Sequence, residues 1–118
     1  MARKKTVVFD FDGVIHSYKS GWKGPTVILD EPVKGIKEVI AQLRKLNYEV
    51  VIVSTRCATE KGIRAIYAYL NKYEIEVDRV CKEKPPAAVY IDDRAICFNG
   101  DCNGLVDKIV NFKNWLGK

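Results

Sequence analysis

The stretch from Val7 to Gly13 constrains this chain most, because an apolar run leads directly into two aspartates and a glycine. The run is β-branched and aromatic, and its apolar side chains fall on both faces of an extended chain. This pattern predicts a buried strand near the middle of a sheet. Charge is costly inside such a strand, so Asp10 and Asp12 are expected at its carboxyl end, where open α/β sheets form their ligand crevice.

Asp10 and Asp12 are two positions apart, so in extended geometry their side chains point the same way. Two carboxylates held close together repel each other. A hard divalent cation, a shared proton or a cationic substrate complex between them relieves that repulsion. The alternative is a strand that ends in two solvated aspartates before a glycine turn. The rest of the sequence favours the first interpretation.

The length of 118 residues predicts one domain, residues 1–118, with a single hydrophobic core. The apolar runs are too short to span a bilayer and no signal-peptide pattern is present, so we predict a cytoplasmic protein without membrane association. The cysteines form no Cys-x-x-Cys pair, which argues against zinc and favours free thiols. The net charge of +5 favours phosphorylated or acidic partners, although many of the basic residues lie near the chain ends.

Residues 14–31 show no sustained periodicity and predict a loop, here called the flap, that overhangs the two aspartates. The candidates for substrate contact in the flap are His16, Tyr18, Lys19, Trp22 and Lys23. Aromatic side chains suit stacking on a base or another ring. The alternative, that the aromatic residues only pack the flap onto the body of the protein, is equally open.

A helix is predicted from Pro32 to about Leu46, followed by a buried strand over residues 49–53. This strand, helix and strand unit should have a right-handed crossover and parallel strands. Thr59 is expected to cap a second helix over residues 60–73.

Residues 77–82 predict a short edge strand, residues 83–86 interrupt regular structure, and residues 88–91 predict another buried strand. A last helix is predicted from apolar residues at helical spacing, namely Leu105, Ile109, Phe112 and Leu116. The alternation of strands and helices predicts an α/β, three-layer, Rossmann-like fold with a central, mainly parallel sheet.

Polar side chains follow three of the predicted strands. They are Asp10 and Asp12, Ser54 and Thr55, and Asp92 and Asp93. The ends of parallel strands share one edge, so these groups should form one all-oxygen site, which favours Mg²⁺ completed by substrate phosphate oxygens. One aspartate can then attack phosphorus while the second serves as acid and base. Arg56 adds a guanidinium suited to a phosphoryl oxygen.

Four short motifs resemble those of the haloacid dehalogenase superfamily of aspartyl-phosphate phosphatases. In chain order they are Asp10-Phe11-Asp12-Gly13, Ser54-x-Arg56, Lys84-Pro85 and Asp92-Asp93. The resemblance covers nearly the whole chain. It implies a Rossmann-like fold of the haloacid dehalogenase type, Mg²⁺ as cofactor and hydrolysis of phosphomonoesters through an aspartyl-phosphate intermediate.

The resemblance also implies roles for individual residues. Asp10 would be the nucleophile and Asp12 the general acid and base, with the Asp12 backbone carbonyl binding the metal beside Asp10. Ser54 would hold a phosphoryl oxygen together with Thr55, Arg56 and Gly13, and Lys84 would stabilise the phosphoryl group. Asp93, with Asp92 beside it, would complete the metal site. Asp93 is preferred as the direct ligand, although Asp92 and Asp93 could exchange roles. Lys82 competes with Lys84 for the lysine role, although Lys84-Pro85 fits the family pattern better.

Larger members of that superfamily insert a cap domain after the first motif or between the second and third. Neither interval holds one here, so the chain resembles a small capless member with an open crevice. A nucleotide or a polynucleotide end is the first choice of substrate, with a sugar phosphate, another small metabolite or a phosphoprotein as alternatives. A second hypothesis is a non-catalytic domain that binds a metal or a phosphorylated ligand. The sequence predicts no oligomeric state, and Cys57, next to Arg56, raises the further hypothesis of redox sensitivity.

Overall fold

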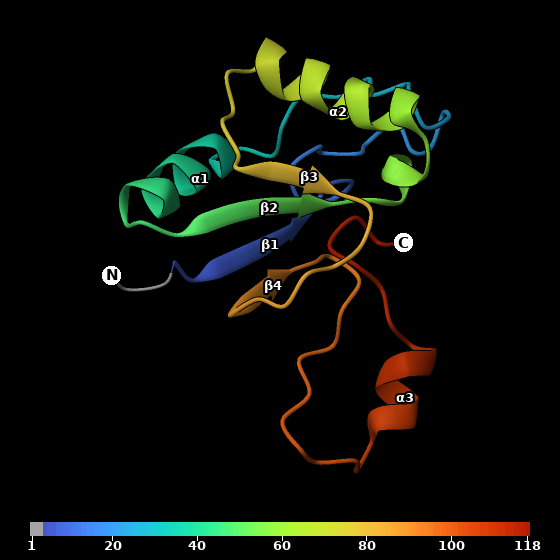
Figure 1. Cartoon of the computed structure of the whole chain (residues 1–118). Coiled ribbons are helices and arrows are strands. Elements are labelled where there is room, and N and C mark those ends of the chain that lie inside the picture. The colour runs from blue at the N-terminus through green and yellow to red at the C-terminus, as the bar shows by residue number, and fades with distance from the viewer. Residues whose placement is uncertain (1–3) are drawn as a thin grey trace.

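The computed structural model describes residues 4–118 (Figure 1). The elements in chain order are β1 (Thr6–Asp10), α1 (Ile36–Lys45), β2 (Glu49–Val53), the 3-10 helix η1 (Thr55–Ala58), α2 (Glu60–Lys72), β3 (Arg79–Cys81), β4 (Val89–Ile91) and α3 (Leu105–Val110). The strands form one four-stranded sheet in the order β3-β2-β1-β4, and every pair is parallel. The predicted α/β class, with a parallel sheet flanked by helices and no cap domain, is confirmed.

The main core lies on one face of the sheet. Val7 and Phe9 of β1 and their register partners Val50 and Ile52 of β2 point to this face. Ile40 of α1 and Ile66 and Leu70 of α2 pack against them, so both long helices cover the same side. The central position of β1 follows from its sequence, because a strand with apolar side chains on both faces is stable only where neighbours cover it.

Helix α1 begins later than predicted. Pro32 forms an isolated antiparallel bridge with His16, and Val33 N–H donates to the carbonyl of Ile15 (2.8 Å), so this stretch is tied to the flap. Gly35, at φ 87°, then turns the chain into the helix at Ile36. The prediction of α2 is confirmed, including its cap: the Thr59 side chain accepts from Gly62 N–H (3.1 Å).

The region after β3 departs most from the sequence-based prediction. Strand β4 is present, but its residues are 38–49% exposed, because β4 is an edge strand and α3 lies apart from the sheet (Figure 1). Helix α3 ends at Val110 and buries no residue, so the prediction that Phe112 and Leu116 extend it is wrong. Of the cysteines in the described part of the chain, all are free and Cys57 is buried. No helix among residues 4–118 is long and apolar enough to cross a membrane.

Candidate functional site

The carboxyl ends of β1, β2 and β4 meet at one edge of the sheet. Asp10 is the last residue of β1, Ser54 follows β2, and Asp92 and Asp93 follow β4. Because β1 lies between β2 and β4 and all three strands run parallel, the turns after them are neighbours. The strand endings predicted from the sequence therefore do come together.

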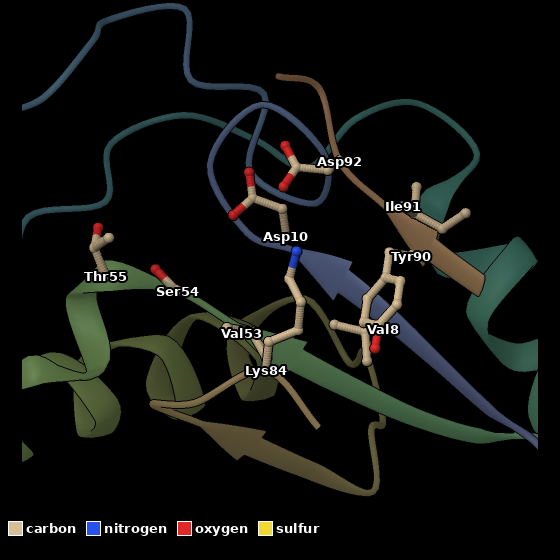
Figure 2. A pocket seen from close by; sticks show the side chains of 9 residues that line it. All are labelled: Val8, Asp10, Val53, Ser54, Thr55, Lys84, Tyr90, Ile91 and Asp92. Atoms are coloured by element: carbon tan, nitrogen blue, oxygen red, sulfur yellow. The ribbon is translucent and has the colours of Figure 1, made fainter. Parts of the chain in front are cut away.

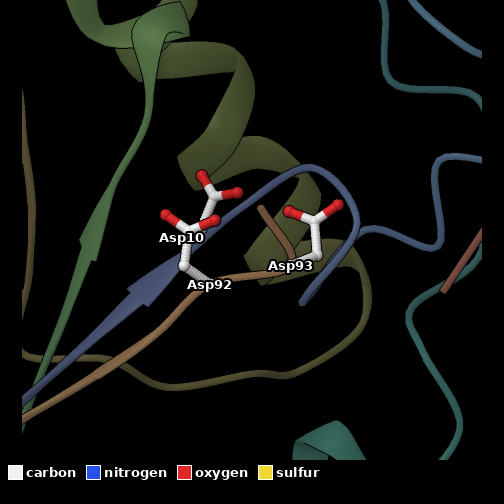
Figure 3. A group of neighbouring side chains, drawn as sticks. All are labelled: Asp10, Asp92 and Asp93. Atoms are coloured by element: carbon white, nitrogen blue, oxygen red, sulfur yellow. The ribbon is translucent and has the colours of Figure 1, made fainter. Parts of the chain in front are cut away.

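Asp10, Asp92 and Asp93 form an acidic cluster (Figure 3). Each offers a carboxylate oxygen, and these oxygens lie within 4.8 Å of one another. Burial, followed by the charge of Asp92 and the closeness of Asp93, raises the pKa of Asp10 to about 7. A divalent cation bound among these oxygens would remove the repulsion that causes part of this shift.

Asp93 is held so that one of its oxygens is free. Its Oδ2 accepts a hydrogen bond from Asn114 Nδ2 (2.8 Å), whereas its Oδ1 is buried without a partner. A buried carboxylate oxygen without a donor is costly, and a metal ion is the partner that this acidic setting favours. Gly13 lies against the same carboxylate, and a Cβ at this position would collide with it. Gly13 is also in the left-handed region (φ 86°), so glycine is required here on both counts.

A small pocket of about 120 Å³ adjoins the acidic cluster (Figure 2). It is lined on one side by Asp10 and Asp92 and on the other by Ser54, Thr55 and Lys84. The amine of Lys84 points toward Asp10, and it also lies 4.8 Å from the centroid of the Tyr90 ring (Figure 2). Lys82 does not line this pocket, so the geometry favours Lys84 over Lys82. A lysine ammonium and two hydroxyls opposite carboxylates form a suitable place for a phosphoryl group.

Asp12 is not one of the three acids of the cluster, and its carboxylate is bound by Arg56 and His16. Arg56 donates through Nε to Asp12 Oδ2 (2.9 Å) and through Nη2 to Oδ1 (3.0 Å). His16 donates from Nδ1 to Asp12 Oδ1 (2.8 Å), because its Nε2 accepts from the backbone N–H of Asp30 (3.1 Å). Burial alone would raise the pKa of Asp12, but these hydrogen bonds, from His16 and then Arg56, lower it.

Arg56 has no exposed surface, and its guanidinium makes its hydrogen bonds to groups of the protein itself. Besides Asp12, its guanidinium donates through Nη1 to the flap carbonyls of Gly24 (2.9 Å), Pro25 (3.0 Å) and Val27 (3.2 Å). The predicted phosphate-binding role therefore does not fit the position of Arg56. Gly13 was expected to bind phosphate as well, but its backbone N–H donates to the carbonyl of His16 (2.8 Å) and is not available.

The flap forms the wall of a second, larger pocket of about 290 Å³. Tyr18 and Trp22 line it together with Asp10, Asp12, Ser54, Thr55, Asp93 and Arg94. The other flap candidates lie elsewhere. His16 is buried, which excludes it as a substrate contact, Lys19 pairs with Glu31 (2.8 Å), and Lys23 does not line either pocket at the site.

Sequence reasoning missed the C-terminal turn, residues 114–118. Asn114 Oδ1 accepts from the backbone N–H groups of Leu116 (3.1 Å) and Lys118 (2.9 Å), which orients the amide that donates to Asp93. Trp115 Nε1 donates to the carbonyl of Gly13 (2.6 Å). The turn thus connects the loop after β1 to the loop after β4. Nothing in the local sequence indicates this contact, because it joins residues 102 positions apart.

Two solved structures resemble this fold. The first is a conserved protein from Bacteroides thetaiotaomicron, which is 22% identical with a TM-score of 0.59, over 98% of this chain and 97% of that one. The second is a chain of the Pnkp1/Rnl/Hen1 complex, 14% identical with a TM-score of 0.56, over 98% of this chain and 37% of that one. At these identities the likeness establishes a shared fold alone. Comparisons with family models and with curated proteins give no match.

Proposed function

We propose that this chain is a Mg²⁺-dependent phosphomonoesterase of the haloacid dehalogenase type that acts through an aspartyl-phosphate on Asp10. The observation that carries the proposal is the convergence of the Asp10, Asp92 and Asp93 carboxylates within 4.8 Å, beside a pocket lined by Lys84, Ser54 and Thr55. A cluster of acids alone would not point to phosphate chemistry. The lysine and hydroxyls opposite the cluster supply the complementary half of a phosphoryl site.

The residues present fit a magnesium ion. The ligands are carboxylate oxygens, which Mg²⁺ prefers, and the partnerless Oδ1 of Asp93 is the first candidate ligand, with Asp10 and Asp92 as the others. The backbone carbonyl of Asp12 is a further candidate by resemblance. When bound, the ion would neutralise charge on Asp10 and on the phosphoryl oxygens.

The protein groups would divide the reaction as follows. A carboxylate oxygen of Asp10 attacks phosphorus, the ester P–O bond breaks, and the leaving alkoxide takes a proton from solvent water. Lys84, Ser54 and Thr55 hold the oxygens of the transferring group. Water then attacks the phosphorus of the acyl phosphate, which releases inorganic phosphate and restores the Asp10 carboxylate. Asp12 would accept the proton of this water.

Arg56 and His16 hold Asp12 in its ionised form, which suits the second half-reaction better than the first. An ionised carboxylate can accept a proton from water at once, but it cannot protonate a leaving oxygen until it has itself taken up a proton. We therefore assign Arg56 as a positioning residue for Asp12 and assign it no contact with phosphate. On this account, substrates with good leaving groups depend less on Asp12 than substrates with poor ones.

A nucleotide or a polynucleotide end is the substrate that we favour. Two aromatic side chains, Tyr18 and Trp22, line the pocket that also contains Asp10, and residues 4–118 include no cap domain over it. A small sugar phosphate would use the acidic cluster and Lys84 but would leave the aromatic wall without a partner.

Phosphate release from a panel of esters tests this proposal. The panel contains mononucleotides, oligonucleotides phosphorylated at the 3′ or the 5′ end, and sugar phosphates, each measured with Mg²⁺ and with chelator. We expect turnover that requires Mg²⁺ and is abolished by Asp10→Asn. The matched control is Asp101→Asn, an exposed aspartate outside the site, which should keep full activity. Turnover that survives Asp10→Asn would overturn the proposal.

The second candidate function is a non-catalytic domain that binds a metal ion or a phosphorylated ligand. The observation that favours it is the engagement of Asp12 by Arg56 and His16, which removes the group that a phosphatase needs as an acid. Calorimetry separates the two functions. Mg²⁺ binding that is lost in Asp93→Asn, without turnover of any ester in the panel, would establish the binding domain.

A further inference from the structure

Trp22 differs from an ordinary exposed tryptophan on a loop. Its side chain is 49% exposed and lines the pocket of about 290 Å³ that also contains Asp10, Ser54 and Asp93. Burial is the usual way to stabilise an indole ring, but about half of Trp22 is exposed, although it lines a pocket that carboxylates also line. An aromatic surface open to a polar pocket is the arrangement by which proteins bind planar ligand rings.

The Trp22 ring packs against a buried and firmly held side chain, that of Arg56. The Cζ atom of Arg56 lies 4.6 Å from the centroid of the Trp22 ring, within the range of a cation–π contact. Arg56 is itself completely buried and is fixed by Asp12 and by the carbonyls of Gly24 and Pro25. The ring is therefore positioned in advance, and a ligand that stacks on it would not have to order the flap first.

We propose that Trp22 is the base-stacking wall of the substrate pocket, so that the substrate is a nucleotide whose base packs on the indole while its phosphate lies at Asp10. The assignment of the phosphate position rests on the proposed function, but the stacking surface does not. Tyr18 lines the same pocket and borders the ring site. Arg56 contacts both the indole ring and the Asp12 carboxylate, so it supports two parts of the site without contacting the substrate.

The steady-state test compares two substrates that differ only in the base, adenosine 5′-monophosphate and ribose 5-phosphate. Loss of one base–aromatic stacking contact weakens binding by roughly one to two powers of ten. We therefore expect Trp22→Ala to raise KM for adenosine 5′-monophosphate about tenfold and to leave KM for ribose 5-phosphate unchanged. Trp22→Phe keeps an aromatic face and should retain most of the discrimination.

The matched control is Phe98→Ala, which removes an aromatic side chain that is 57% exposed and does not line the pocket. It should change neither KM. If Trp22 only packs over Arg56, Trp22→Ala will impair both substrates equally through Asp12. That equal loss, or no change with either substrate, would overturn the proposal.

A binding measurement separates failure of this proposal from failure of the proposed function. In an Asp10→Asn background, which should not turn over substrate, adenosine 5′-monophosphate should quench tryptophan fluorescence, and ribose 5-phosphate should not. The quenching should disappear in Trp22→Phe, in which Trp115 is the remaining tryptophan. Quenching without phosphate release from any ester would leave the stacking site standing and reject the phosphatase. Phosphate release without base-dependent quenching would support the phosphatase and reject the stacking site.

The same measurement distinguishes two sources of the base. Quenching at lower concentration by a short 5′-phosphorylated oligoadenylate than by adenosine 5′-monophosphate would assign the stacking wall to a chain end. Quenching by both compounds at the same concentration would assign the stacking wall to a mononucleotide. Quenching by neither compound would overturn the proposal.

Discussion

The two halves of the candidate site are supported in different ways. Asp10 is the last residue of a strand whose core residues Val7, Val8 and Phe9 are at most 5% exposed. Asp92 and Asp93 follow β4, whose residues are all exposed, and the helix after them, α3, buries nothing. The N-terminal half is positioned by hydrophobic burial. The C-terminal half is positioned by the pairing of β4 with β1 and by a few polar contacts, chiefly the hydrogen bond from Asn114 to Asp93 and the hydrogen bond from Trp115 to Gly13.

This difference implies that stability and metal binding depend on different parts of the chain. Substitutions in the region from β1 to α2 should lower the free energy of unfolding. Substitutions in the C-terminal region should disturb the acidic cluster while costing little stability, because few apolar contacts are lost.

The largest effect is expected for Arg56→Ala. The substitution leaves Asp12 half-buried without its ion pair and also leaves the carbonyls of Gly24 and Pro25 without donors. Breaking a buried pair in this way costs about 3–5 kcal/mol. Urea denaturation measures the loss, and Arg64→Ala, which removes an exposed pair with Glu60 on α2, should cost less than about 1 kcal/mol. A similar small loss for both variants would contradict the structure around Arg56.

The same substitution in two helices compares the two regions directly. Ile66 of α2 has no exposed surface, whereas Ile109 of α3 is 58% exposed. Ile66→Ala should cost about 2–5 kcal/mol through the lost contacts and the cavity left behind. Ile109→Ala should stay within about 0.5 kcal/mol of the wild type in the same denaturation experiment. A large loss for Ile109→Ala would mean that α3 packs against the body of the protein in solution.

Asn114→Ala tests the polar support of the C-terminal half. We expect a loss of about 1 kcal/mol in stability, because one hydrogen-bonding side chain is removed. Calorimetry should show Mg²⁺ affinity lower by about tenfold, the usual effect of removing a group that orients a metal ligand.

Asn111→Ala is the matched control for Asn114. Asn111 also donates from its side-chain amide, to the carbonyl of Asp107 (2.9 Å), but it lies away from the acidic cluster. Its Mg²⁺ affinity should match that of the wild type. Equal Mg²⁺ affinity in Asn114→Ala would show that Asp93 needs no support from the C-terminal turn.

The smallest effect is expected for Asp10→Asn in the absence of divalent cations. The folded protein raises the pKa of Asp10 from 3.8 to about 7, so it binds this proton more tightly than the unfolded chain does. The wild type should therefore lose stability as the pH rises from 3.8 to about 7, and the amide should not. Thermal unfolding should show equal stability of the two proteins at low pH and an advantage for Asp10→Asn at pH 8, on the order of 1 kcal/mol. A stability advantage of Asp10→Asn that is the same at every pH would exclude the raised pKa of Asp10 as its cause.

The sequence predicts the first half of the fold well because its signals are local. The apolar run before Asp10, the run at Glu49–Val53 and the cap at Thr59 each indicate an element within a few residues, and the structure contains all three. The start of α1 was predicted too early because Pro32 pairs with the distant His16. Strand β4 was predicted as buried because its composition is apolar, but burial depends on its place at the sheet edge.

For the site, the sequence predicts which residue types come together, but their orientations depend on distant partners. The convergence of Asp10, Asp92 and Asp93 follows from parallel strands that end in acids. The turn of Arg56 toward Asp12 could not be predicted, because it is set by the flap carbonyls of Gly24 and Pro25. The contact of Asn114 with Asp93 spans 21 positions through a weakly patterned segment, so no local signal indicates it.

The most direct test of the central claim is to trap the phosphoryl group on Asp10. In Asp12→Asn, the attack of water on the acyl phosphate should be slow, and 4-nitrophenyl phosphate, which has a good leaving group, should still transfer its phosphoryl group. After Mg²⁺-dependent reaction and acid quenching, peptide mass spectrometry should find a phosphoryl group on Asp10, absent in chelator and in Asp10→Asn. Phosphate release with no phosphorylated Asp10, or with the group on another residue, would contradict the account.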